Sequence, residues 1–217
     1  SLVGSEMCIR DSYWLEQLIS GGIVLPEYQR SFVWTKEQII NFIKSIGKDE
    51  FIPPVTIGKL NDKNIIIDGQ QRLTSIALAY LNVLPSERKY KKTVKVEVDN
   101  EDDELEEEHY FEWTINTLKE LGPNINEVKN ALAGNENYET LGTHWVNDEF
   151  LKKHYLGFSY IIPHSDTTED DQHRFFSTIF RNVNIGGTNL LKTESRKSLY
   201  YLNKAYAVSY THLTLPP

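Results

Sequence analysis

The sequence contains a single cysteine, Cys8, and a single methionine, Met7, and both lie within the first twelve residues. The rest of the chain therefore has no thiol, which excludes a disulfide framework, a cysteine-based zinc site and a cysteine nucleophile there. The chain also lacks an apolar run of the ~20 residues that a membrane-spanning helix needs. These absences favour a protein of the reducing cytoplasm that does not associate with a membrane.

Positive charge is also scarce, since 23 lysines and arginines stand against 31 acidic residues, for a formal net charge of −8. Residues 99–108 alone contain eight acids, as many as the whole excess. We interpret this acidic run as a solvent-exposed linker, with a DNA mimic or a tail for a basic partner as alternatives. The remainder is near neutral, so composition does not indicate a broad basic DNA-binding face.

The two ends of the chain have the character of foreign sequence. A DNA stretch that encodes residues 7–12, Met-Cys-Ile-Arg-Asp-Ser, has a reverse complement that encodes residues 208–212, Val-Ser-Tyr-Thr-His. A transposon-based sequencing adapter leaves such an inverted repeat when it is translated, and the alternative is two unrelated natural peptides. We therefore expect residues 1–12 and 207–217 to be non-native, exposed and outside the compact domain.

Hydrophobic periodicity predicts an α+β fold: a small mixed sheet packed by helices, with a helical insertion. A content of 40% apolar and 12% aromatic residues is typical of a globular chain. We expect a core over 13–98, the acidic run and a helical insertion over 99–156, and a strand plus C-terminal helices over 157–206. Strands are expected at 23–25, 55–57, 64–67, 93–98 and 158–162, and helices at 35–47, 70–81, 111–121, 125–132, 168–183 and 192–202.

Residues 65–75, which we call the second segment, carry the strongest chemical signal. A predicted buried strand runs through Asp68 and Gly69 into a helix whose first turn holds Gln70, Gln71 and Arg72. The first turn of a helix has free N–H groups and the positive end of the helix dipole, so it favours anions. Arg72 adds a planar guanidinium suited to phosphate oxygens. The alternative is a plain helix start, in which Asp68 caps the helix and Gly69 makes the turn.

Two further segments combine polar groups with conformational signals. The first segment, residues 25–34, places three aromatic residues beside Arg30, which suits stacking on a base and binding of phosphate. It equally suits a packed loop in which Arg30 pairs with a carboxylate. The third segment, residues 180–190, contains Gly186 and Gly187, which permit close approach of the backbone to a ligand. Its alternative is a helix–helix turn with a left-handed glycine.

Together the three segments resemble the N-terminal domain of GmrSD restriction endonucleases. The matching patterns are Leu-Pro-x-Tyr-Gln-Arg-x-Phe-Val-Trp, Ile-Asp-Gly-Gln-Gln-Arg-Leu-Thr and Asn-x-Gly-Gly-Thr-x-Leu-x-x-x-Glu, in the same order and at similar spacing from Leu25 to Leu199. The family usually shows Phe-x-Arg-Ile/Leu-Asn before the Gly-Gly loop, whereas in this chain Arg181 and Asn182 stand where x and Arg are expected. It also has Leu191 where a small helix-capping residue usually follows.

The resemblance implies a ParB- and sulfiredoxin-like nucleotide-binding core that binds and hydrolyses a nucleoside triphosphate, with Mg²⁺, in order to recognise or act on modified DNA. It implies that a C-terminal or separate His-Asn-His nuclease domain cleaves the DNA; that motif does not occur in this sequence. Two other functions stay open. One is a ParB-like, nucleotide-gated DNA-binding module without hydrolysis, and the other is a pocket that reads the DNA backbone or a modified base directly.

The resemblance also implies a set of site residues, which must converge in space if the three segments form one site. Asp68, Arg72 and Gln71 would be catalytic, with Asp68 also holding the metal ion. The nucleotide would be bound by Tyr28, Gln29, Arg30, Gly69, Gln70, Thr74, Asn184, Gly186, Gly187 and Glu194. Ordinary core packing does not require a loop, a helix start and a Gly-Gly turn to present polar groups to one cavity, so convergence tests the prediction.

Overall fold

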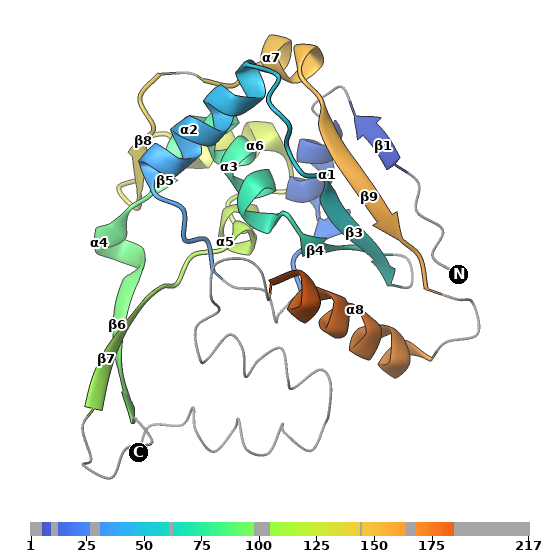
Figure 1. Ribbon diagram of the computed structural model, residues 1–217. Coiled ribbons are helices and arrows are strands. Elements are labelled where there is room, and N and C mark those ends of the chain that lie inside the picture. Colours follow the sequence, from blue (N-terminus) through green and yellow to red (C-terminus); the bar gives the residue numbers. More distant parts are fainter. Residues whose placement is uncertain are drawn as a thin grey trace.

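A computed structural model of the chain (Figure 1) describes residues 6–9, 13–26, 31–60, 63–97, 105–143, 145–163 and 168–184. Its centre is a five-stranded sheet in the order β1-β9-β3-β4-β2. The strands are β1 (Glu6–Ile9), β2 (Ile23–Val24), β3 (Val55–Leu60), β4 (Lys63–Asp68) and β9 (Leu156–Ile161). The sheet is mixed, because β3 pairs antiparallel with β4 but parallel with β9, and β2 runs parallel to β4. The small mixed sheet predicted from the sequence is therefore confirmed.

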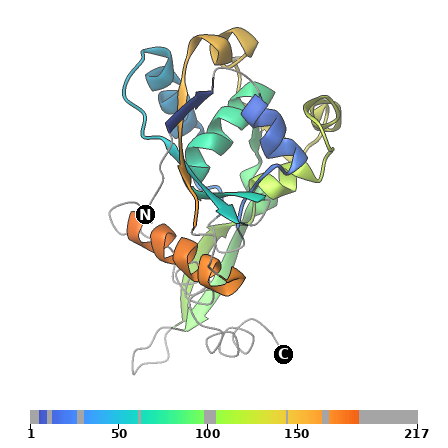
Figure 2. The same ribbon diagram turned by 90° about the vertical axis from the view of Figure 1, so that its right-hand side faces the viewer.

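Helices cover both faces of this sheet, and alternate residues of β4 show how. Ile66 is buried in the main core with α1 (Tyr13–Ser20), α2 (Lys36–Gly47) and α3 (Gln70–Leu81). Ile65 and Ile67 instead pack with Phe176 and Phe180 of α8 (Glu169–Asn184). Successive side chains of a strand point to opposite faces, so α8 lies on the other face of β4. Figure 2 shows α8 separated from α1 and α3 by the strands.

Local signals in the sequence account for the helices that bound the site. Thr35 and Gln38 form the predicted capping box at the start of α2: the Thr35 hydroxyl accepts from the Gln38 amide, and the Gln38 side chain accepts from the Thr35 amide. Helix α3 spans the predicted residues, with one apolar face in the core, and the residue that caps its C-terminus, Asn82, is in the left-handed conformation. The sequence did not predict α1, whose residues Trp14, Leu15, Leu18 and Ile19 are buried.

Residues 83–153 connect α3 to β9; this range begins earlier than the predicted insertion at 99–156, and we call it the insertion from here on. Their elements are β5 (Val83–Pro85), α4 (Glu87–Tyr90), β6 (Lys91–Glu97), β7 (Leu105–Phe111), α5 (Ile115–Lys119), α6 (Ile125–Leu132), β8 (Tyr138–Thr140) and α7 (Asp148–Lys153). Trp113, Ile115, Leu118 and Val128 belong to the same buried cluster as α1 and α3. The insertion therefore shares the main core.

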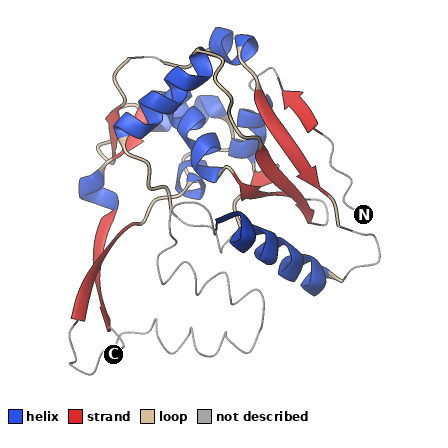
Figure 3. Cartoon of the chain, viewed as in Figure 1, coloured by secondary structure: helices blue, strands red, loops and turns tan. Residues whose placement is uncertain are grey.

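The prediction of a helix from Phe111 to Leu121 is wrong at its start. Strand β7 continues to Phe111, Trp113 is fully buried, and the Thr114 side chain caps α5 by accepting from the Asn116 amide. Strands β6 and β7 form an antiparallel ribbon that projects from the body (Figure 3). The end of the acidic run, residues 105–108, lies in β7 and is thus strand, whereas residues 99–104 lie outside the described residues.

The expectation that residues 1–12 lie outside the domain is wrong for Glu6–Ile9, whose backbone forms β1. This strand pairs with β9 from Glu6↔Ser159 to Ile9↔Leu156. An open strand edge offers backbone N–H and C=O groups to any extended segment, so this pairing requires no particular side chain. The non-native origin of both ends stays a prediction, and residues 207–217 lie outside the described part of the chain. Within that part, no helix has the length and apolar character to cross a membrane.

Candidate nucleotide site at the start of α3

The turn between β4 and α3 depends on Gly69. Its backbone is left-handed (φ 88°), and its carbonyl accepts from the Leu73 amide at 2.9 Å, so Gly69 is the N-cap of α3. A Cβ there would lie 2.9 Å from Arg72 Nη2 and 3.0 Å from Val55 Cγ2. Asp68 is one residue too early to cap, and α3 has no side-chain cap. The plain-cap interpretation, with Asp68 as the N-cap, is therefore wrong.

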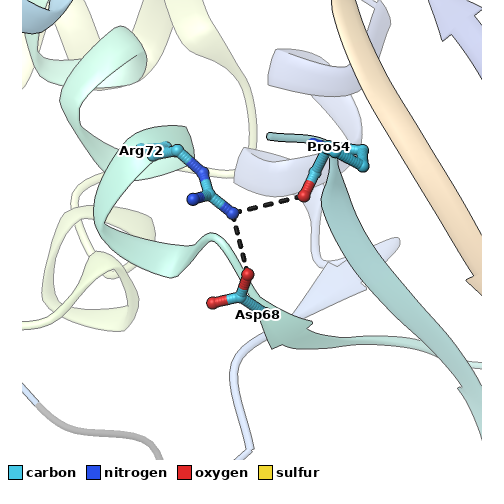
Figure 4. Close-up of polar contacts among 3 residues, drawn as sticks. All are labelled: Pro54, Asp68 and Arg72. Carbon is cyan, nitrogen blue, oxygen red and sulfur yellow. Dashed lines mark hydrogen bonds and ion pairs between the residues drawn. The ribbon is translucent and has the colours of Figure 1, made fainter. Parts of the chain in front are cut away.

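Asp68 and Arg72 instead form a partly buried ion pair (Figure 4). Arg72 Nη2 lies 2.8 Å from Asp68 Oδ2 and also donates to the Pro54 carbonyl at 3.2 Å. The Arg72 side chain is 18% exposed and the Asp68 side chain is 32% exposed. The guanidinium thus connects the end of β4, the approach to β3 and the first turn of α3. Its Nε is buried and has no hydrogen-bond partner among the described residues, so the arginine retains an unused donor.

Gln71 brings the first and second segments together. Its Oε1 accepts from the Val33 amide at 3.0 Å, and its Nε2 donates to the Ser31 carbonyl at 2.9 Å. Both ends of the carboxamide are therefore bonded to the backbone of the first segment, and Gln71 is only 7% exposed. This arrangement is local evidence that the two segments share one end of the sheet. Gln70 and Thr74 are also buried.

Two residues of the insertion also hold the first segment and the strand just before it, and neither was identified from the sequence. The Trp113 carbonyl accepts from the Phe32 amide at 2.9 Å, and the Lys119 ammonium donates to the Ile23 carbonyl at 2.9 Å. Burial lowers the pKa of Lys119 to about 8. The sequence held a signal for Lys119, because it lies four residues after buried Ile115 and so falls on the apolar face of that helix.

Helix α8 leads toward the same end of the sheet. It runs in the direction of β4, so that its C-terminal end lies near the Asp68 end of that strand (Figure 1). Gly58 of β3 permits this packing, because a Cβ there would lie 2.5 Å from Phe176 Cε1. Asn184 ends the helix, while Gly186, Gly187 and Glu194 of the predicted site lie outside the described residues. So do Tyr28, Gln29 and Arg30 of the first segment.

The described residues offer Asp68 as the acidic group of this site. Within them, no three His, Cys, Asp or Glu side chains lie close enough together to hold a metal ion by themselves. A Mg²⁺ ion bound with a nucleotide does not need such a cluster, since it is commonly held by one or two carboxylates together with phosphate oxygens and water. The ion pair with Arg72 uses one Asp68 oxygen, and the partial exposure of the carboxylate is compatible with such a role.

Comparison with known proteins supports the match to a restriction family. A 90-residue stretch is 30% identical to a protein of Methanocaldococcus jannaschii described as uncharacterized; it covers 30% of this chain and only 16% of that protein. No solved structure matches the chain. The model of one family, described as the N-terminal domain of GmrSD restriction endonuclease, matches residues 14–201 and so includes all three segments. The chain belongs to the family of GmrSD restriction endonuclease N-terminal domains.

Proposed function

We propose that this domain binds and hydrolyses a nucleoside triphosphate at the β4–α3 turn, as the nucleotide-dependent part of a modification-dependent restriction system that defends against phage. The observation that carries the proposal is the pairing of Gln71 with the backbone at Ser31 and Val33. It brings the first segment to the helix start that bears Asp68 and Arg72. Chance packing of a capped helix and an unrelated loop gives no reason for this juxtaposition.

The chemistry of the turn suits a triphosphate. The first turn of α3 supplies backbone N–H groups and the positive end of a 12-residue helix. Arg72 supplies a guanidinium with an unused Nε donor, and Arg30 is proposed as a second phosphate ligand. When bound, Mg²⁺ would supply charge neutralisation at the phosphate oxygens. Asp68 would hold that ion or orient the attacking water, and the exclusion of bulk water from the buried Gln70 and Gln71 side chains would strengthen these interactions.

The rest of the proposal follows from the family. We infer a core related to the ParB and sulfiredoxin folds, and DNA, in a modified form, as the macromolecular ligand. The domain would act with a His-Asn-His nuclease domain, fused or separate, that cuts the DNA. The near-neutral charge outside the acidic run supports a separate DNA-cutting domain, since the composition does not indicate a broad basic face for binding DNA.

The proposal is tested first by Arg72→Ala. Loss of a charged hydrogen-bond donor should weaken triphosphate binding by roughly 1.5–3 kcal/mol. Binding is measured by titration with a fluorescent nucleoside triphosphate, with each common base in turn. Arg88→Ala is the matched control, because Arg88 is an exposed arginine of α4 and its removal changes the net charge equally. Equal affinity of the two variants would exclude Arg72 from the nucleotide site.

Hydrolysis is tested separately by Asp68→Asn. The substitution removes the charge that pairs with Arg72, at a cost in stability of about 1 kcal/mol for a partly exposed pair. We expect the domain to stay folded and to bind nucleotide, but to release phosphate at least about 100-fold more slowly if the carboxylate handles metal or water. Phosphate release at saturating nucleotide measures this rate. Normal turnover by the variant would remove hydrolysis from the proposal and leave binding.

The ion pair itself favours a second candidate, a nucleotide-gated switch without hydrolysis. In the structure, Arg72 is bound to Asp68 and to the Pro54 carbonyl. A phosphate that takes the guanidinium must compete with the carboxylate, so binding would alter the β4–α3 turn. This candidate predicts that a non-hydrolysable triphosphate changes the affinity for DNA as much as the natural nucleotide does. A DNA affinity that follows only turnover would reject it.

A further inference from the structure

We propose that the insertion positions the first segment at the nucleotide site. Lys119 holds the chain at Ile23, just before the segment, and Trp113 holds it at Phe32, near the C-terminal end of the segment. The inference rests on the proposed function, because it assigns these residues a role in the binding of the same nucleotide. Neither residue belongs to the three segments. Both come from the stretch of chain around α5, which the sequence marks only as part of a helical insertion.

The chain just before the first segment is held at strand β2, which is the edge strand of the sheet next to β4. The outer side of such an edge strand leaves carbonyl groups without a partner in the sheet. The Lys119 ammonium lies 2.9 Å from the Ile23 carbonyl and donates to it from α5. Lysine rarely occupies a partly buried position without a polar partner, because an ammonium loses hydration there. The bond therefore gives a specific reason for a lysine at this position.

The C-terminal part of the first segment is held from two sides, because neighbouring residues of an extended segment point in opposite directions. Ser31 and Val33 bond to Gln71 of α3, whereas the Phe32 amide donates to the Trp113 carbonyl. The Phe32 ring packs edge-on against the Trp113 ring, with centroids 5.8 Å apart, and both side chains are buried. Trp113 is itself anchored, since its Nε1 donates to the Tyr138 hydroxyl at 3.1 Å.

The hydrogen bonds at Ile23 and Phe32 limit how far the backbone can move at these two positions. Ile23 and Phe32 are held by residues only six positions apart in the insertion, at 113 and 119. Displacement of about 1 Å in residues that position a substrate can cost a large part of the catalytic rate. Lys119 and Trp113 are thus positioning residues: they touch neither nucleotide nor metal in this scheme, and they act through the first segment.

The test compares Lys119→Met, which removes the donor and the charge, with Lys119→Arg, which retains both. In the complete chain we expect Lys119→Met to weaken binding of the fluorescent triphosphate about tenfold, the equivalent of one charged hydrogen bond at the low end of its range. Lys119→Arg should restore it to within about threefold, allowing for its different geometry. Lys129→Met is the matched control, since Lys129 lies on α6 of the insertion over the Tyr80 ring and is not one of the residues that hold the chain at Ile23 and Phe32. Weakening in the control equal to that in Lys119→Met would overturn the proposal.

A second measurement does not depend on nucleotide. Amide hydrogen exchange at Phe32 and Val33 should be slow in the unmodified chain and at least about tenfold faster in Lys119→Met and in Trp113→Phe, while the amides of α2 remain protected. Unchanged exchange with unchanged binding would overturn the inference. If the unmodified chain binds no triphosphate, the proposed function fails, and exchange alone decides whether the insertion holds the segment. If Lys119→Met does not fold, Lys119→Gln, which keeps an uncharged donor, is measured in the same way.

Discussion

At the scale of single residues, the second segment combines a conformational requirement with a chemical one. Gly69 must adopt a positive φ and must also leave room for Val55 and Arg72. Only a residue without a Cβ meets both conditions. The Asp68–Arg72 pair is therefore built on a turn that requires glycine at position 69.

Gly69→Ala should lower the free energy of unfolding by about 2–4 kcal/mol, since it adds steric contact to a left-handed backbone. Gly21→Ala is the control for the backbone term, because Gly21 has nearly the same φ, 86°, and no atom within 4 Å of the added Cβ. That control should cost only about 1–2 kcal/mol. Urea unfolding of both variants gives the difference, and equal losses would show that the contact with Val55 and Arg72 has no energetic weight.

The residues that form the site were easier to predict from the sequence than the groups to which each of them bonds. The sequence indicated that Asp68, Gln71 and Arg72 belong together, and the structure places them in one turn. It could not show that Gln71 bonds to Ser31 and Val33, because that contact spans about 40 residues of sequence. Nor could it show that Asp68 pairs with Arg72 instead of capping α3. That choice depends on whether the N-cap falls at residue 68 or 69, a shift of one position.

At the scale of elements, the sequence predicted correctly those features that depend on residues close together in the chain. The capping box at Thr35 and Gln38 and the apolar stripe of α3 act within one turn or one helix, and both appear as expected. Prediction failed at residues 111–114, because Phe111 and Trp113 have no strong preference for helix: pairing with β6 makes Phe111 part of a strand, and Trp113 is buried before α5 begins. Strand β8 was missed for the same reason, since its partner β5 lies more than 50 residues earlier.

The packing of α8 against β3 depends on Gly58. Gly58→Ala places a Cβ 2.5 Å from Phe176 Cε1, so α8 must shift or the ring must rotate. We expect a loss of about 1–3 kcal/mol in unfolding free energy, as for overpacking in a core. The double variant with Phe176→Leu should recover part of that loss. A double-mutant cycle measured by urea unfolding checks this, and strict additivity would show that the two side chains do not compete for the same space.

At the scale of the whole molecule, the buried charge of Lys119 links stability to pH. Its pKa is lowered from 10.5 to about 8 in the folded chain. A lowered pKa means that the folded state holds the proton less tightly, so the stabilisation is present above pH 10.5 and is lost as pH falls through about 8. Relative to Lys119→Met, the unmodified chain should gain about 1–2 kcal/mol between pH 8 and 10, after allowance for partial solvent exposure. Urea unfolding across this range measures the gain, and parallel curves for the two proteins would contradict it.

The general class of the molecule followed from composition and periodicity, but its connectivity did not. Forty per cent apolar residues and a mixture of short strands and helices predicted a mixed α and β domain. No local signal shows that β9 lies between β1 and β3, or that β2 pairs with β4. These neighbours are chosen by which apolar faces can be buried together, and that choice depends on the complete chain.

The position of β9 has a consequence for the newly made chain. Val55 of β3 pairs in register with Phe158 of β9, so β3 and β4 can form their hairpin long before the strand that completes the sheet is synthesised. At about 5–20 residues per second, translation of the intervening stretch takes on the order of 5–20 s. During that interval β3 presents an unpaired edge to the surroundings, and chaperones that bind extended chains have their best opportunity to engage it.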